Sequence, residues 1–355
     1  MKKILFFTPG LDIGGIEKVF VTYANYLVEH NYLVYYAYCH NSGKLEKTLS
    51  TKVIRCSLGN IRLLYSLPLL ISLLKRIKPN YLITGGDYSN CLAVIATSFV
   101  KSTKCILSHH SYFNIETNKT ISTFLMRMFY NRSHKIISVS KGISEFLQSI
   151  GIKSTQLATI YNPLDIQQIK RDCMQNISLK LNLPYNDYLV FVGRLSPVKN
   201  LKMMFDAFKL VLSKKSNIKL VIVGDGTEYN TLVEYSHSLG INKSIIFIGA
   251  TSNPYLYMKY AQLVLLSSLS EALPTVILES FVLGKTVVST PTEGAKDLLA
   301  NGKFGYLSPN VDSPDLFATA ILAAYDSKIP SEVLYERAKM FSIEKQANAL
   351  CQILV

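Results

Sequence analysis

Residues 188–201 read YLVFVGRLSPVKNL, an apolar run that ends in glycine and is followed by an arginine, a lysine and the start of a helical pattern. The apolar run predicts a buried strand. Arg194 can grip phosphate oxygens through a bidentate fork, and Lys199, five residues later, adds a compact charge. The stretch therefore predicts a site for a diphosphate between a strand and a helix, with an exposed loop carrying two ordinary surface cations as the alternative.

Short apolar runs alternate with helical patterns through the second half of the chain. The expected strands are 188–192, 219–223, 245–248, 263–266 and 286–289. The expected helices lie near 200–213, 227–238, 254–260, 274–283 and 314–326. This alternation is typical of βαβ units, which build parallel sheets.

The first half shows the same alternation. Its expected strands are 3–8, 32–38, 52–55, 81–84, 104–108 and 135–139, and its expected helices lie near 16–30, 61–77, 89–99, 119–131 and 141–149. Pro163 restricts Asn162 to an extended shape, so we expect the boundary between two domains there. The domains expected are 1–163 and 164–339, with a helix at about 340–355 packing back on the first. Such domains bind ligands at the carboxyl ends of their strands.

Two glutamates stand eight positions apart in residues 270–279, which read SEALPTVILE. Glu271 follows an apolar strand, Pro274 suits the first turn of a helix, and Glu279 lies within that apolar helix. The N-terminus of the helix would direct backbone N–H groups to a place where they can bind a phosphate. In the alternative interpretation Glu271 caps the helix and Glu279 is merely exposed, although a cap alone would not need the second glutamate.

The loop at 193–201 and the Glu-x7-Glu spacing resemble the retaining GT-B glycosyltransferases of glycosyltransferase family 4, also called glycosyl transferases group 1. The resemblance covers nearly the whole chain and includes GGIEK at 14–18, VS at 139–140, YNP at 161–163 and VGDG at 223–226. It implies an α/β GT-B fold with two Rossmann-like parallel-sheet domains facing each other across a cleft. Domain 1–163 would face the acceptor and the membrane, and domain 164–339 would bind a nucleotide sugar.

The resemblance also implies roles for individual residues. Arg194 and Lys199 would neutralise the departing diphosphate of the donor. Glu271 would hydrogen-bond hydroxyls of the donor sugar, and Glu279 would hold the ribose of the nucleotide. The remaining donor-binding residues that it implies are Gly14, Gly15, Gly193, Ala250, Leu273, Pro274, Thr275 and Val276. The family often has Glu-Gly-Phe-Gly where this chain has EALP at 271–274, so the identity of the donor sugar stays open.

A pair of histidines follows the expected strand 104–108, in SHHS at 108–111. The family usually has a histidine near the donor sugar at this point. Of His109 and His110 we favour His110, because the family's histidine tends to follow the strand by a residue or two; a structural histidine is the alternative. Adjacent side chains in an extended loop diverge, and the sequence has no Asp-x-Asp triplet. We therefore expect no metal ion and no cofactor beside the nucleotide-sugar substrate.

Positive charge is concentrated in the first half of the chain. Residues 1–163 contain 19 Lys and Arg against 7 Asp and Glu, a net charge of +12, whereas residues 164–355 contain 19 against 17, a net charge of +2. Such asymmetry indicates an anionic partner. The helix at 119–131 combines large apolar side chains with Lys119 and Arg127, which predicts contact with an anionic bilayer surface; 61–77 is a second candidate. Packing on the protein's own sheet is the alternative for both.

The expected location is the cytoplasm, peripherally on the inner face of the cell membrane. No uninterrupted apolar stretch reaches the about 18 residues of a membrane span. The apolar run at 4–7 is too short for a signal peptide. Six scattered cysteines indicate reduced thiols rather than a disulfide framework or a zinc site.

The resemblance implies a retaining transferase that moves a hexose or N-acetylhexosamine from a nucleotide sugar to a lipid-linked glycan, and we expect it to be metal-independent. The resemblance implies UDP as the nucleotide and a bacterial surface polysaccharide, such as O-antigen, capsule or lipopolysaccharide, as the product. The alternatives are a GT-B nucleotide-sugar epimerase and a non-enzymatic basic protein that binds membrane surfaces. A dinucleotide dehydrogenase would need Gly-x-Gly-x-x-Gly after the first strand, which Gly10, Gly14 and Gly15 do not match. The lack of tryptophan and the dispersed basic residues argue against a nucleic-acid partner.

Overall fold

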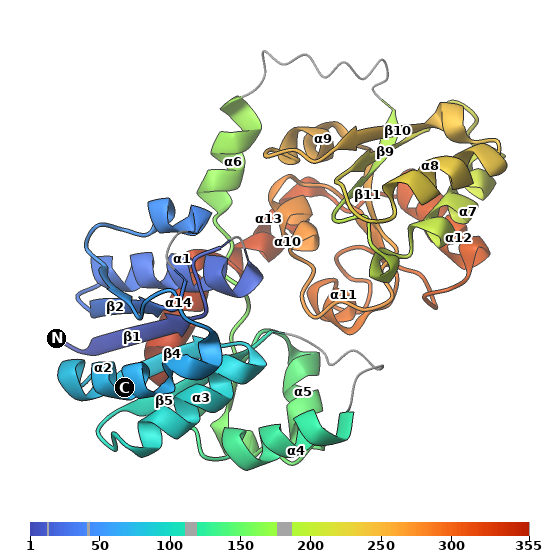
Figure 1. The fold of residues 1–355 in the computed structure, drawn as a ribbon. Helices are drawn as coiled ribbons and strands as arrows, with labels where there is room; N and C mark the ends of the chain where they lie inside the picture. Colours follow the sequence, from blue (N-terminus) through green and yellow to red (C-terminus); the bar gives the residue numbers. More distant parts are fainter. Residues whose placement is uncertain (13, 41–42, 111–118, 176–186, 355) are drawn as a thin grey trace. The chain divides into compact units, whose positions relative to one another are not determined.

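The chain divides into two compact units, which Figure 1 shows in colours that follow the sequence. The computed structural model describes residues 1–12, 14–40, 43–110, 119–175 and 187–354. Unit 1 comprises Met1–Pro163 and Ile343–Val355, and unit 2 comprises Leu164–Ser342. Each unit is built around one parallel sheet.

The sheet of unit 1 has seven strands in the order β3-β2-β1-β4-β5-β6-β7. Their bounds are β1 Lys3–Thr8, β2 Leu33–Tyr38, β3 Ile54–Ser57, β4 Tyr81–Gly85, β5 Lys104–His109, β6 Lys135–Ser138 and β7 Leu157–Thr159. β1 lies between β2 and β4 and is buried from its second residue to its end, which is why its sequence is a continuous apolar run. The strand order changes direction between β1 and β4. This pair is therefore the switch point, where open sheets of this kind bind ligands.

The helices of unit 1 are α1 Gly15–Glu29, α2 Leu67–Ile77, α3 Asp87–Ser98, α4 Lys119–Tyr130, α5 Lys141–Ser149 and α14 Ile343–Ile353, with short 3-10 turns at Lys44–Thr48, Leu63–Ser66 and Ser154–Gln156. α1 packs against α14, and α2, α3 and α4 lie side by side (Figure 1). Leu350 and Leu354 join Ile4, Phe6 and Phe20 in one buried core. Burying each such side chain stabilises the fold by about 1.5–3 kcal/mol, so the end of the chain is part of unit 1.

The sheet of unit 2 has six strands in the order β10-β9-β8-β11-β12-β13. Their bounds are β8 Tyr188–Val192, β9 Lys219–Val223, β10 Ile245–Gly249, β11 Leu263–Leu266, β12 Val287–Ser289 and β13 Tyr306–Leu307. Here the order changes direction between β8 and β11, which makes that pair the switch point of unit 2.

Unit 2 contains the helices α6 Ile166–Gln175, α7 Leu201–Leu212, α8 Tyr229–Ser238, α9 Tyr255–Tyr260, α10 Thr275–Val282, α11 Glu293–Leu298, α12 Pro314–Asp326 and α13 Ser331–Lys339, with short 3-10 turns at Pro197–Lys199 and Asn242–Ser244. α7 packs closely against α12. Phe205 and Phe208 from α7 meet Phe317 from α12 over Phe191 of the central strand. This core fixes the strand ends from which the loops of the candidate site depart.

Both halves have the parallel α/β architecture that the sequence predicts, and that prediction is confirmed. α2 begins at Leu67 rather than near residue 61, because a 3-10 turn precedes it and Pro68 suits its first turn. The elements that the sequence analysis missed are β7, β13, α6, α11 and α13. They are short or polar: β13 has two residues, and α13 buries only Leu334 and Ala338. Within the described ranges, no helix is both long and apolar enough to span a membrane.

Candidate active site

Two loops leave the sheet side by side at the switch point of unit 2. β8 and β11 are hydrogen-bonded neighbours, and neighbouring parallel strands end at the same edge of a sheet. β8 continues into Gly193 and Arg194, and β11 continues into Ser267 and Ser268. This edge therefore collects the cations and the carboxylate that the sequence assigns to the donor.

Lys199 and Glu271 come together from these two loops as an ion pair, with the lysine Nζ donating to the carboxylate Oε1. The same Oε1 atom accepts a hydrogen bond from Ser268 Oγ at 2.8 Å. Ser267 Oγ donates to the Lys199 carbonyl at 2.7 Å. The side chains of Lys199 and Glu271 are only 23% and 17% exposed, so their pairing offsets part of the cost of removing both charges from water.

Arg194 differs from Lys199 because its guanidinium has no hydrogen-bond or ion-pair partner among the residues that the structure describes. Its side chain is exposed, while the adjacent Leu195 is fully buried. Gly193 N donates to Val223 O at 3.0 Å, and this hydrogen bond fixes the backbone just before Arg194. The guanidinium can therefore meet phosphate oxygens with its rigid fork of donors without first breaking an ion pair.

Glycines in the loop after β9 hold the Arg194 loop by close backbone contact. A Cβ atom on Gly224 would lie 1.9 Å from Gly193 O, and one on Gly226 would lie 2.2 Å from Leu195 O. Gly224 has a φ of +143°, a conformation that side-chain-bearing residues rarely adopt. Leu195 N also donates to Asp225 O at 2.9 Å. The VGDG motif after β9 is thus explained by the space that the neighbouring loop occupies.

The N-terminus of α10 lies next to Glu271 in the chain. Leu273 and Pro274 are buried, Thr275 is exposed and Val276 is half-buried. Pro274 is the N-cap residue and makes no side-chain hydrogen bond to the helix. The N–H groups of the first turn are therefore left without a side-chain cap, and they favour an anionic ligand together with the helix dipole.

Gly294 is a residue of this site that the sequence analysis missed. Its N–H donates to Glu271 O at 3.0 Å, and a Cβ atom on it would lie 2.7 Å from Ala272 O. Thr292 caps α11 by accepting a hydrogen bond from Ala295 N at 3.4 Å. The available signal was TEG at 292–294, in which a threonine N-cap and a glycine follow a strand. Ser268, which holds the Glu271 carboxylate, was also missed.

Glu279 is half-buried in the second turn of α10. Burial, and after it the negative charge of Glu279, raises the pKa of the Tyr255 hydroxyl at the start of α9. α9 packs against α10. Gly249 ends β10, and the exposed Ala250 follows it in the segment before α9. The structure thus places Glu279 beside α9, and this helix begins shortly after Ala250 in the chain.

The switch point of unit 1 carries glycines where unit 2 carries cations. Gly14 precedes α1 and Gly15 begins it. A Cβ atom on Gly14 would lie 2.0 Å from Oε2 of Glu17, whereas one on Gly15 would meet nothing within 4 Å. Burial raises the pKa of the Glu17 carboxyl, and the charge of Asp12 adds to this. Gly14 therefore makes room for the Glu17 side chain, and Gly15 leaves open space above the loop.

The two histidines after β5 differ in their partners. His109 is 1% exposed, with its Nδ1 atom 3.3 Å from the Tyr130 hydroxyl and 3.6 Å from Asp87 Oδ1. His110 is half-buried, with its Nε2 atom 2.8 Å from Ser108 Oγ. Burial, and after it the neighbouring His109, lowers the pKa of His110 to about 3. The His110 imidazole is therefore neutral at physiological pH.

Asp87, Asn90 and Tyr130 around His109 were not foreseen from the sequence. Asn90 Nδ2 donates to the Tyr130 hydroxyl at 2.9 Å and to Ser108 O at 3.1 Å. These residues come from α3 and α4, and no spacing in the sequence links them. Only the packing of the two helices brings them to the end of β5.

Metal-ligating side chains are dispersed. Over the parts of the chain that the structure describes, no group of three or more His, Cys, Asp or Glu side chains is arranged to hold a metal ion. The six cysteines are free thiols. A metal-independent mechanism stays a prediction.

Family models match both halves of the chain. The model described as Glycosyltransferase Family 4 matches residues 13–168, and the model described as Glycosyl transferases group 1 matches residues 176–341. The two matches follow one another and leave only short segments uncovered.

Among curated proteins, two enzymes of Campylobacter jejuni are similar. N-acetylgalactosamine-N,N'-diacetylbacillosaminyl-diphospho-undecaprenol 4-alpha-N-acetylgalactosaminyltransferase is 26% identical over 61% of this chain and 60% of its own length. GalNAc-alpha-(1->4)-GalNAc-alpha-(1->3)-diNAcBac-PP-undecaprenol alpha-1,4-N-acetyl-D-galactosaminyltransferase is 27% identical over 97% of this chain and 95% of its own length. The chain thus spans about 60% of the length of the first of these relatives.

The fold is also that of a solved structure, HepE of Anabaena in complex with UDP. The two chains superpose with a TM-score of 0.82 at 19% identity, over 100% of this chain and 99% of HepE. Such a likeness establishes the fold alone. Because family models match both halves, and each half is a parallel-sheet unit as in the GT-B fold, the chain belongs to the glycosyltransferases of family 4.

Proposed function

We propose that this protein is a retaining glycosyltransferase that moves a hexose or N-acetylhexosamine from a UDP-sugar to a lipid-linked glycan. The observation that carries the proposal is the meeting of three features at the switch point of unit 2. These are Arg194, whose guanidinium has no partner among the described residues, the Lys199–Glu271 ion pair, and the N-terminus of α10, which has no side-chain cap. Together they offer cations and N–H donors for a diphosphate beside a carboxylate for sugar hydroxyls.

Arg194 and Lys199 neutralise the charge that develops on the departing diphosphate. Charges that are fixed in place before the reaction need no reorganisation at the transition state, and such preorganisation is usually the largest catalytic effect. Lys199 reaches the diphosphate by leaving Glu271, with which it is paired in the free protein. Its departure releases the Glu271 carboxylate to accept hydrogen bonds from the donor sugar. Donor binding thus replaces one ion pair by two sets of substrate contacts.

The rest of the donor binds along the same edge of unit 2. The N–H groups of Thr275 and Val276, at the start of α10, meet the diphosphate, and the buried Leu273 and Pro274 hold that backbone in place. Glu279 accepts hydrogen bonds from the ribose hydroxyls. The nucleotide base lies near Ala250, and Gly193 lets the backbone approach the phosphates.

The reaction needs no strong general base in this proposal. The acceptor hydroxyl attacks from the face that the diphosphate leaves, and a phosphate oxygen of the leaving group takes its proton. His110 offers a neutral hydrogen-bonding group to the donor sugar, because its lowered pKa keeps it uncharged. Gly14 and Gly15 let their loop pass close to the diphosphate. The cations of the chain perform the charge neutralisation that a metal ion performs elsewhere.

UDP and a lipid-linked acceptor are supported by the similar proteins. HepE of Anabaena has been solved with UDP and with UDP-glucose. The names of the two Campylobacter enzymes contain diphospho-undecaprenol and PP-undecaprenol. The proposed product is a bacterial surface polysaccharide such as O-antigen, capsule or lipopolysaccharide. The basic unit 1 would place the protein peripherally on the anionic inner face of the cell membrane, where such an acceptor is found.

A release assay with a panel of donors tests the proposal. Purified protein is incubated with UDP-, GDP- and ADP-sugars, with and without a bacterial lipid extract, and the free nucleotide and the sugar products are measured. We expect UDP release from one donor, with strong enhancement by the extract and a sugar that appears in the lipid fraction. Conversion of the donor sugar into its epimer without an acceptor would instead identify an epimerase. Lack of binding and release with every donor would refute the transferase.

A further inference from the structure

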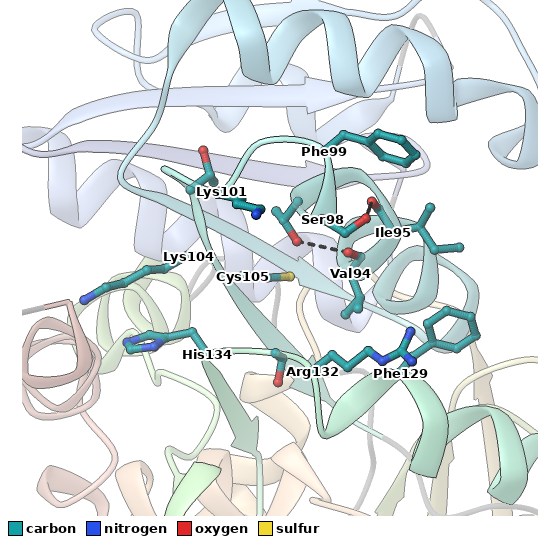
Figure 2. A pocket seen from close by; sticks show the side chains of 13 residues that line it. Val94, Ile95, Ser98, Phe99, Lys101, Lys104, Cys105, Phe129, Arg132 and His134 are labelled. Atoms are coloured by element: carbon teal, nitrogen blue, oxygen red, sulfur yellow. Dashed lines mark hydrogen bonds between the residues drawn. The ribbon is translucent and has the colours of Figure 1, made fainter.

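A pocket of about 550 Å³ lies at the amino-terminal end of β5 in unit 1, between the ends of α3 and α4 (Figure 2). His109 and His110 lie at the opposite end of this strand, roughly 17 Å away at 3.3 Å per residue. The pocket is therefore separate from the switch point of unit 1, and the proposed transfer reaction does not use it. Its principal lining residues are Ile95, Phe99, Lys101, Lys104, Arg132 and His134.

The lining of this pocket is basic and contains no carboxylate. Lys101, Lys104 and Arg132 are exposed, and none of the three has an ion-pair partner among the residues described in unit 1. Burial, followed by the charges of Lys104 and Lys135, lowers the pKa of His134. The two lysine charges thus add to the effect of burial and mark a positive field around the imidazole. An anion would relieve this repulsion.

The helix ends explain only part of this charge. α3 and α4 both end at the pocket, and cations that follow a helix C-terminus are stabilised by the helix dipole. This accounts for Lys101 and Arg132, which come shortly after the two helices. It does not account for Lys104, which begins β5. From residue 88 to 144 the sequence has seven Lys and Arg and one acidic residue, Glu116, which lies outside the described residues. The sequence of this region therefore has more cations than carboxylates.

Exposed apolar side chains border these cations. Phe99 lines the pocket and is 63% exposed (Figure 2). On α4, Phe124 is 63% exposed and Met128, one turn before Arg132, is 37% exposed. The binding of a soluble phosphate does not require exposed aromatic side chains beside the cations. At a bilayer, cations meet headgroups while neighbouring apolar side chains enter the boundary with the acyl chains.

We propose that this pocket binds the phosphate of an anionic lipid headgroup and thereby holds unit 1 on the membrane surface. Arg132, Lys101 and Lys104 surround the phosphate, and Phe99, Phe124 and Met128 enter the interfacial layer. The inference rests on the membrane association within the proposed function, which it assigns to one pocket. It does not depend on the chemistry of sugar transfer.

Vesicle sedimentation tests this assignment with the full chain. Vesicles of phosphatidylcholine alone are compared with vesicles that also contain phosphatidylglycerol. The test variant is Lys101→Ala/Lys104→Ala, and the matched control is Lys47→Ala/Lys52→Ala, which removes two exposed cations elsewhere in unit 1. Since each cation near an anionic surface contributes about fivefold to binding, the test variant should lose roughly 30-fold in partitioning. The control should stay close to wild type, and Lys101→Arg/Lys104→Arg should restore binding.

The other outcomes overturn the inference. An equal loss in the test and control variants would mean that diffuse charge, and not the pocket, attracts the membrane. If inorganic phosphate inhibits vesicle binding, and the protein binds phosphatidylglycerol vesicles no better than phosphatidylcholine vesicles, the pocket would belong to a soluble phosphate compound instead of a lipid. Donor turnover in detergent separates this result from a failure of the proposed function. The Lys101→Ala/Lys104→Ala variant should release UDP normally there, whereas Arg194→Ala should lose release and still bind vesicles.

Discussion

The switch points of the two units have the same topology and different chemistry. In unit 2 the loops after β8 and β11 carry Arg194, Lys199 and Glu271, of which the last two are ion-paired. In unit 1 the chain carries glycines at 14–15, at the start of α1, and at 85–86, where β4 leads into α3. The sheet topology thus supplies two equivalent places for a ligand, and the loop residues decide what each can bind. Unit 2 offers cations for a diphosphate, whereas unit 1 offers glycines beside the carboxyl groups of Asp12 and Glu17.

Removal of a cation from unit 2 should have the largest effect on turnover. We expect Arg194→Ala or Lys199→Ala to lower kcat by roughly two to three orders of magnitude, because each loses a preorganised charge at the leaving group. The measurement is UDP release at saturating donor. Lys243→Ala, which removes an exposed lysine just before β10, serves as the control and should remain near wild type. Near-normal transfer by either site variant would show that the cation does not neutralise the leaving group, and the chemical difference between the two units would lose its functional meaning.

A methyl group added to a glycine should affect the stability of the two units very differently. Gly224→Ala places its Cβ atom against Gly193 O in unit 2 at an unfavourable φ. We expect it to lower the free energy of unfolding by about 2–4 kcal/mol. Gly15→Ala meets open space in unit 1 and should change that free energy by less than about 0.5 kcal/mol. Urea denaturation of both variants gives the comparison, and equal losses would contradict it. A fall in turnover for Gly15→Ala at unchanged stability would support close passage of the donor.

A neutral side chain at Glu279 should weaken nucleotide binding more than it slows chemistry. Hydrogen bonds to a charged group contribute about 1.5–3 kcal/mol, so Glu279→Gln should weaken UDP binding about tenfold or more. Calorimetric titration with UDP measures this effect, and kcat at saturating donor provides the companion value. A loss confined to kcat would indicate that Glu279 contacts the reacting groups and not the ribose.

The neutral His110 of unit 1 should be detectable in the pH dependence of stability. Its pKa is about 3 in the folded protein and about 6.5 in the unfolded chain. Between these values the unfolded chain binds more protons, so this contribution to stability is present above pH 6.5 and is lost as the pH falls below it. We expect His110 to account for about 1–2 kcal/mol of the fall in unfolding free energy between pH 7 and pH 5. His110→Gln should flatten the curve over this window. Parallel curves for the variant and the wild type would show that the folded-state pKa is close to normal.

The sequence predicted the central strands and the charged loops well because those features are local. β8 and β11 are continuous apolar runs, and Arg194, Lys199 and Glu271 lie in the connections that follow these two strands. Since a parallel sheet brings strand ends to one edge, residues 72 positions apart, such as Lys199 and Glu271, could be expected to meet.

The features that escaped prediction depend on tertiary packing. β7 and β13 are too short to show a period, and α6 and α13 have few apolar residues. Gly294 matters only because the carbonyl of Ala272 lies against it. The hydrogen bonds around His109 join α3, α4 and β5, so no stretch of sequence contains them. Partners of this kind are set by the fold.

A crystal structure of the protein with UDP tests the central claim most directly. We predict that the diphosphate binds at the switch point of unit 2, with its oxygens on the Arg194 guanidinium, the Lys199 Nζ atom and the first-turn N–H groups of α10. Lys199 should then have left Glu271. A nucleotide bound away from this edge, or a diphosphate without contact to Arg194 beside an intact Lys199–Glu271 pair, would contradict the account.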